Sequence, residues 1–300
     1  MHSSPTRRHI SRAFVPLVLA GLVAGCVGQA GVRPSESSGG PVSASPTVPA
    51  LALPGDPDTL LIGVRSVGGF VAASYRFEAL PTLALYADGR LIEQGAVPAI
   101  YPGPLLPALL VRRLASAELQ RILAAADAAG LRPVAPVSYP PHGVADAPDT
   151  VVSVWSPDGV RETSFGAFGI EQADVPAAEA AARSAAASFI HLLEETTGTG
   201  ETAYVPSAAR VIVRPYENAD PAVEAAPVAW PLGARLADAR PLIADAPSEG
   251  GCLVVSDEDL AAIWTLLEHA TQATPFTQDG ARYLVRVRPL LPDEAAGCGA

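Results

Sequence analysis

The sequence predicts an α+β fold in which antiparallel β meanders with Asp-Gly hairpins pack against about three helices. Asp-Gly pairs lie between apolar runs at Asp88-Gly89 and Asp158-Gly159, and a third, Asp279-Gly280, precedes another apolar run. The pair is a strong hairpin signal, because its turn requires positive φ angles. Repeated hairpins of this kind favour antiparallel pairing over a doubly wound parallel sheet.

The first 25 residues have the pattern of a secretory signal peptide. Arg7, Arg8 and Arg12 form a basic head, which is followed by roughly ten apolar residues and then by small residues. A transmembrane helix needs about 20 apolar residues, and this run is shorter and contains Pro16. We therefore expect a signal peptide over residues 1–25 and not a membrane-spanning helix.

The signal ends in Val23-Ala24-Gly25-Cys26, which resembles the lipobox of bacterial lipoproteins. In that family the cysteine is acylated with a diacylglycerol, through fatty acids such as palmitate, and becomes the new N-terminus. The resemblance implies an extracytoplasmic protein anchored to the cell membrane by a lipid on Cys26, and two acyl chains are what stable anchoring requires. In general style the chain resembles uncharacterised lipoproteins of actinobacterial type, which implies no activity. A plain cleaved signal, in which Cys26 is incidental, is the alternative.

The segment from Thr6 to Arg12 also resembles the twin-arginine export motif, through Arg7 and Arg8. Paired arginines are equally common in the basic heads of ordinary secretory signals. The sequence therefore leaves both export routes open.

Residues 26–57 are rich in Gly, Pro, Ser, Thr and Ala and contain few large apolar side chains. Such a segment buries too little surface to offset its ordering entropy, so we expect a lipid-anchored flexible linker. The extracytoplasmic α+β domain then spans residues 58–300. It has two possible related halves, 58–200 and 201–300, because one helix-and-strand spacing occurs in both, although any amphipathic helix shows that spacing.

Apolar runs within the domain predict strands, and periodic apolar spacing predicts helices. The expected strands cover residues 60–64, 70–71, 83–86, 91–92, 151–155, 160–165 and 283–287. The expected helices begin at residue 115 or 116 and end at Gly130, span residues 176–197, and begin after Ser256, where Asp259 completes a variant capping box. The proline-rich stretches 97–104 and 133–148 are expected to be surface loops.

Composition excludes several classes of function. All 20 basic residues are arginine, so a lysine Schiff base and a phosphate-loop lysine are impossible. The net charge is −11, and an acidic chain without a basic stripe argues against nucleic acid as a partner. The expected partners are therefore the membrane, reached through the lipid, and a surface ligand or protein. We expect no cofactor.

Acylation of Cys26 would leave Cys252 and Cys298 as an even pair in an exported chain, where disulfides persist. The sequence therefore predicts a disulfide between them, and two free thiols are the alternative. It has no Cys-x-x-Cys pair and no Cys/His cluster, so we expect no metal site.

Candidate catalytic chemistry is sparse. His142, with Asp146 and Asp149 in the same proline-rich loop, could supply a general base, although aspartates beside prolines more often form solvated turns. His191 and His269 lie near the ends of expected helices, where a histidine complements the helix dipole. The sequence contains no Gly-x-Ser-x-Gly elbow. The chain is therefore expected to be a binding or scaffolding protein, and the alternative is a hydrolase that uses His142 with Asp146 or Asp149.

Overall fold

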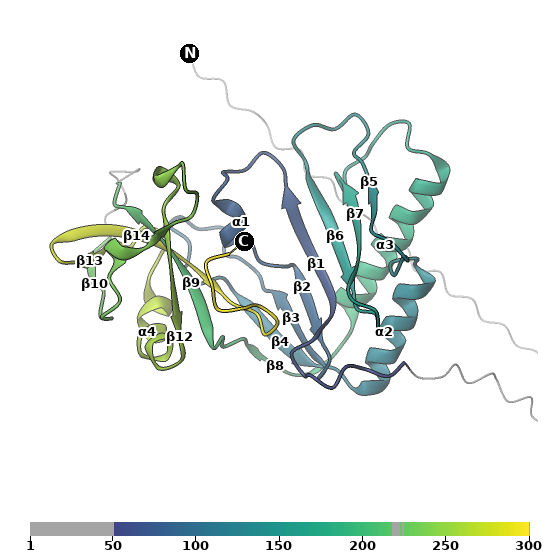
Figure 1. Cartoon of the computed structure of the whole chain (residues 1–300), viewed down its shortest axis with the longest axis horizontal. Coiled ribbons are helices and arrows are strands. Elements are labelled where there is room, and N and C mark those ends of the chain that lie inside the picture. Colours follow the sequence, from purple (N-terminus) through teal and green to yellow (C-terminus); the bar gives the residue numbers. More distant parts are fainter. Residues whose placement is uncertain (1–50, 218–222, 224, 300) are drawn as a thin grey trace, which may run out of the picture. The chain divides into compact units, whose positions relative to one another are not determined.

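The computed structural model describes residues 51–217, 223 and 225–299 and has mixed α and β structure, which confirms the α+β class (Figure 1). Cys26, Arg7 and Arg8 lie outside the described residues. Within the described ranges the α-helices are α1 (Tyr75–Glu78), α2 (Ser116–Ala128), α3 (Ala177–Glu195) and α4 (Asp257–His269). Short 3₁₀ turns span Leu236–Asp238 and Pro247–Glu249.

The strands form a larger and a smaller sheet. The larger sheet has the order β5-β7-β6-β1-β2-β3-β4-β8. Its strands are β1 (Leu60–Gly68), β2 (Leu83–Tyr86), β3 (Arg90–Gln94), β4 (Leu109–Arg113), β5 (Val137–Tyr139), β6 (Pro148–Val154), β7 (Arg161–Gly166) and β8 (Thr199–Ala203). Neighbouring strands run antiparallel except at the β5 edge, where β5 is parallel to β7.

The smaller sheet has the order β10-β13-β14-β9-β12-β11. Its strands are β9 (Ala208–Pro215), β10 (Val228–Ala229), β11 (Arg240–Pro241), β12 (Gly251–Ser256), β13 (Phe276–Gln278) and β14 (Ala281–Pro289). Its pairs are antiparallel except for β10 with β13. Both sheets are therefore mixed, and the parallel pairs at their edges differ from the purely antiparallel pairing that the sequence led us to expect.

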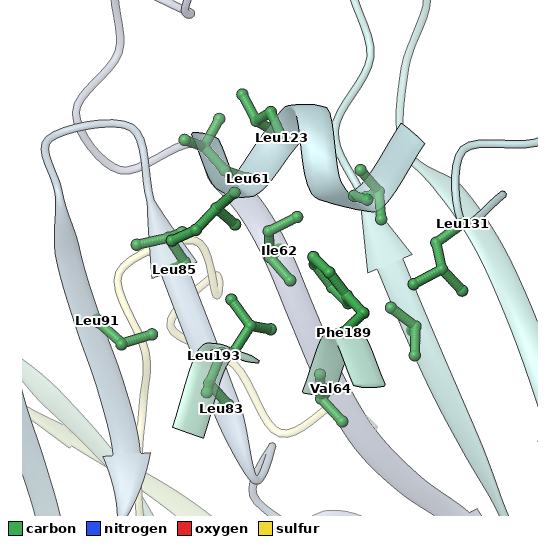
Figure 2. Close-up of a cluster of buried hydrophobic side chains, with 14 of the residues drawn as sticks. Leu61, Ile62, Val64, Leu83, Leu85, Leu91, Leu123, Leu131, Phe189 and Leu193 are labelled. Carbon is green, nitrogen blue, oxygen red and sulfur yellow. The ribbon is translucent and has the colours of Figure 1, made fainter. Parts of the chain in front are cut away.

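One face of the larger sheet packs against α2 and α3 (Figure 1). Because side chains alternate along a strand, Ile62 and Val64 of β1 point to this face. They lie among Leu123 from α2 and Phe189 and Leu193 from α3 (Figure 2). This cluster is the main hydrophobic core of the domain.

The opposite face of the larger sheet is covered by the chain that follows β14. Ala84, Tyr86 and Ile92 pack there against Leu291. The Tyr86 hydroxyl donates a hydrogen bond of 2.7 Å to the Asp293 carboxylate. The C-terminal segment that leaves the smaller sheet therefore joins the larger one. Figure 1 shows this yellow segment between the two sheets.

Gly89 illustrates how local geometry requires a particular residue. It follows β2 with a φ of +88°, and a Cβ atom on it would lie 2.4 Å from the carbonyl oxygen of Leu114. Its own carbonyl accepts a hydrogen bond from the Leu114 amide at 2.8 Å. Only glycine combines this backbone angle with so close a contact.

The predicted strand at Phe70-Val71 is wrong. β1 ends at Gly68, and the positive φ angles of Gly68 and Gly69 turn the chain out of the extended conformation there. The Phe70 amide instead donates to the carbonyl of Asp146. Phe70 is 89% exposed.

The predicted helices over α2, α3 and α4 are confirmed, but the capping box is not. Ser256 is the N-cap of α4 and makes no side-chain cap hydrogen bond there. The next residue, Asp257, has a φ of +50°. The helix start is held by the Asp257 amide, which donates to the carbonyl of Ser207.

The proline-rich stretch 133–148 also differs from expectation, because it contains β5, which lies at a sheet edge where proline is tolerated.

Cys252 on β12 and Cys298 in the C-terminal segment lie at disulfide distance, with their Cα atoms 5.9 Å apart. This geometry fits the predicted disulfide. Near it, the Arg210 Nε donates to the carbonyl of Gly297 at 2.7 Å. The end of the chain is therefore held by a covalent bond and a hydrogen bond together.

Replacing both Cys252 and Cys298 with serine should lower the free energy of unfolding by about 4 kcal/mol, because the bridge closes a loop of 46 residues in the unfolded chain. Urea denaturation measures the change. A reducing agent should destabilise the native protein and leave the double variant unchanged. Titration of two free thiols in the native protein would contradict the bridge.

Candidate functional site

Arginines occupy alternate positions on two neighbouring strands of the smaller sheet. Arg210 and Arg214 lie on β9, and Arg286 and Arg288 lie on β14. The intervening valines of both strands pack in the core with α4. Because strand side chains alternate between faces, the four arginines share the other face. We call these four residues the arginine face.

Carboxylates from outside the sheet neutralise part of this face. Glu78 of α1 forms an ion pair with Arg214, with 3.0 Å between Oε1 and Nη2. The same Nη2 donates to the Ser74 hydroxyl at 2.8 Å. Burial raises the pKa of Glu78, while Arg214 and Arg286 lower it, and the net direction is upward.

Arg288 has the most complete set of partners. It is 5% exposed, and its guanidinium pairs with both oxygens of Glu294 at 2.6 and 2.7 Å. Its Nε donates to the carbonyl of Ala79, just after α1, at 2.8 Å. Glu294 also accepts the Leu291 amide. Planar bidentate pairing of this kind suits arginine in a buried position.

Arg210 differs from Arg288 in its hydrogen-bond partners. It lies directly opposite Arg288 in the β9–β14 register, and like charges in that arrangement repel. It is only 8% exposed. Its Nε bonds to Gly297, but among the described residues its two Nη groups have no hydrogen-bond partner and no carboxylate lies within 4.0 Å. Burial, followed by the charge of Arg288, lowers the Arg210 pKa, while Glu294 raises it, and the net direction is downward; a guanidinium nevertheless stays protonated at neutral pH.

A cavity of about 640 Å³ opens beside Arg210 and Arg288. It is bounded by the end of β1, by α1 and the residues that flank it, and by the arginine face, and we call it the junction cavity. Its polar lining includes Arg65, Arg76 and Glu294, and its apolar lining is Val67, Val71, Ala72, Ala73, Tyr75, Ala79, Leu80 and Pro81. This size and this mixture of apolar wall and few charged groups are typical of small-molecule sites.

The predicted candidate His142 lies elsewhere, in a polar cluster against α3. Its Nε2 is 3.0 Å from Oε2 of Glu179, and the other Glu179 oxygen accepts a bond from Arg183. Arg183 also donates to the carbonyls of Gly166 and Pro140. Burial raises the Glu179 pKa, but the hydrogen bonds from His142 and Arg183 outweigh it, so the pKa lies below its usual range. The cluster fastens the 140–142 loop to α3.

The predicted partners of His142 are used differently. The Asp146 carbonyl accepts the Phe70 amide, and the Asp149 carboxylate accepts the Ser164 hydroxyl at 3.3 Å. Neither is a hydrogen-bond partner of His142 within the described part of the chain. The carboxylate partner of His142 is therefore Glu179, 37 positions away in the sequence, and not Asp146 or Asp149.

The other histidines lie on helix surfaces. His191 is near Glu194 and Glu195 on α3, with more than half of each side chain exposed. The His269 Nδ1 donates to the carbonyl of Thr265, one turn earlier on α4. Among the described residues, no cluster of three or more His, Cys, Asp or Glu side chains is arranged to hold a metal ion, and no helix has the length and apolar character to span a membrane.

Sequence reasoning missed the arginine face, although a signal was present. Arginine recurs at every second or fourth position of two strands, and the residues between the four arginines are valine and isoleucine. Such alternation normally indicates a solvated face, so only the tertiary structure shows that this face is covered.

Comparison with protein families, with curated proteins and with solved structures gave no match.

Replacing Glu179 with glutamine should lower the unfolding temperature at pH 7, because the carboxylate is stabilised by His142 and Arg183. A depressed pKa stabilises the fold above the unfolded value near 4.5, and the effect is lost as the pH falls through the folded value. Thermal melts from pH 7 to pH 3 should therefore converge with those of the native protein at low pH. Glu194→Gln, exposed on the same helix, is the control. A pH-independent difference would contradict the charge effect.

Replacing Glu294 with glutamine should lower the free energy of unfolding by about 3 kcal/mol, because it leaves Arg288 buried without a counter-charge and opposite Arg210. Urea denaturation measures the loss. The matched control is Glu118→Gln, whose surface pair with Arg121 should contribute less than about 1 kcal/mol. Equal losses in the two variants would contradict the special role of the buried pair.

Proposed function

We propose that this chain is a lipid-anchored extracytoplasmic binding protein. A diacylglycerol on Cys26 attaches it to the membrane, and the domain takes its ligand in the junction cavity. The tether is shorter than the predicted 26–57, because the Leu51 backbone already hydrogen-bonds the Gln120 side chain of α2 and Leu53 packs against the main core. The support for the anchor is the lipobox-like Val23-Ala24-Gly25-Cys26 behind a basic head.

The binding role rests on one observation, the buried Arg210 at the wall of a ligand-sized cavity. The Arg210 residue is 8% exposed, and its Nη groups, which have no hydrogen-bond partner among the described residues, depend on whatever fills the cavity. Where such a charge faces a cavity, the missing partner is naturally a ligand. The mostly apolar lining supplies the remaining contact surface.

The alternative, a hydrolase that uses His142 with Asp146 or Asp149, has weaker support. A general base must reach its substrate. The His142 ring is instead bound to Glu179, whose second oxygen is bound to Arg183, and within the described ranges His142 is not among the residues that line the junction cavity. This arrangement suits a structural role better than a catalytic one.

Replacing Cys26 with serine should release the protein from membranes, because the acidic chain has no other expected means of attachment. Cell fractionation and metabolic labelling with palmitate measure the change, and we expect near-complete loss of both signals. The control is the Cys252→Ser/Cys298→Ser double variant, which should keep its lipid. Unchanged membrane partition of the Cys26→Ser protein would place the anchor elsewhere.

A further inference from the structure

We propose that the ligand of the junction cavity is an amphiphilic anion, a small molecule with an apolar body and a carboxylate or phosphate head that Arg210 binds. This inference rests on the proposed function and specifies the chemistry of its ligand.

Arg210 carries a charge that no protein carboxylate pairs with among the described residues. Arg210 and Arg288 face each other across two strands, and Glu294 forms an ion pair with Arg288 only, with both of its oxygens engaged by that side chain and by the Leu291 amide. The Nη groups of Arg210 are thus left without a protein acceptor among the described residues. Two parallel N–H donors match the paired oxygens of a carboxylate or phosphate.

Arg65 and Arg76 add positive charge to the cavity lining. Arg65 already bonds to the Ser153 hydroxyl and to the Glu162 carboxylate. Arg76 is exposed, lies over the ring of Phe77, and has no ion-pair partner in the described part of the chain. The lining therefore carries more positive than negative charge, although the chain as a whole has a net charge of −11. A local reversal of the overall charge selects for an anion.

The apolar side chains that line the cavity are partly exposed to water. Val71 and Tyr75 are 53% and 48% exposed, and Val67 is 38% exposed. All three line the cavity. Gly69 also lines the cavity, with a φ of +82° and a Cβ position only 3.2 Å from the Pro148 nitrogen, so a larger residue would be strained there. An apolar body attached to the anionic head would cover these side chains and remove them from water.

Binding can be measured by calorimetry on the full mature chain carrying Cys26→Ser, so that no attached lipid interferes. The probes share one chain length and differ in the head: decanoate, decyl phosphate, decanol and decyltrimethylammonium. We expect decanoate or decyl phosphate to bind at least about tenfold more tightly than decanol, as expected for a charge-assisted hydrogen bond. The stronger of the two identifies the head group, and the cation should not bind.

Arg210→Gln should weaken binding of the anionic probe by about 10- to 100-fold and leave decanol binding unchanged. Arg76→Gln, at an exposed position where folding is not at risk, should weaken the anion by a smaller factor. Arg235→Gln is the matched control, since Arg235 pairs with Asp279 outside the cavity.

The outcomes separate the two proposals. Equal affinity for decanol and the anions, or no effect of Arg210→Gln, would overturn the anionic ligand while the cavity stays a binding site. Binding of none of the probes would overturn the anionic ligand and count against the cavity as well. Membrane attachment through Cys26 is decided separately by fractionation.

Discussion

The neutralisation of the arginine face is the constraint on which the arrangement of the two sheets depends. A sheet face with four arginines is stable in water but not under a covering layer, unless the layer brings carboxylates. The covering elements meet this requirement. α1, which follows β1, brings Glu78 to Arg214, and the segment after β14 brings Glu294 to Arg288. The contact between the sheets thus depends on charge pairing as well as on apolar packing. The apolar part comprises the small cluster of Phe77, Ile212, Leu242 and Cys252 with Cys298, together with the packing of Leu291 on the larger sheet and of Leu105 in the core of the smaller one.

The same constraint explains the cavity. Each carboxylate neutralises the arginine that it reaches, and the register of β9 and β14 places Arg210 beside an arginine and not beside an acid. The C-terminal segment, held by Cys252–Cys298, satisfies one Arg210 donor through the carbonyl of Gly297 and leaves the remaining donors without a protein partner among the described residues. A cation with few protein partners in a covered position lowers stability. Its presence at a cavity wall is the strongest argument for a binding role.

Local features were predictable from the sequence, whereas contacts over long separations were not. The helices α2, α3 and α4 follow from apolar spacing, and the Cys252–Cys298 pair follows from counting cysteines, because both depend on short-range or compositional information. The strand expected at Phe70-Val71 failed because two glycines with positive φ turn the chain there. The pairing of Arg214 with Ser74 joins residues 140 positions apart, and no periodicity in either segment indicates it. The candidate site is built from such long-range contacts, so the sequence pointed to His142 and not to Arg210.

All basic residues of the chain are arginine, and arginine suits the covered arginine face better than lysine would. Lysine is strongly hydrated and loses its charge readily when buried, whereas arginine remains charged and can bond in a plane to several acceptors at once. Arg288 uses this geometry fully, with donors to Glu294 and to the carbonyl of Ala79. A chain whose basic residues are all arginine can therefore place cations inside a junction where lysine would be neutral. In this protein the composition and the site are linked, because Arg210 can be both buried and charged, and a fixed charge beside an apolar wall is what recognition of an amphiphilic anion requires.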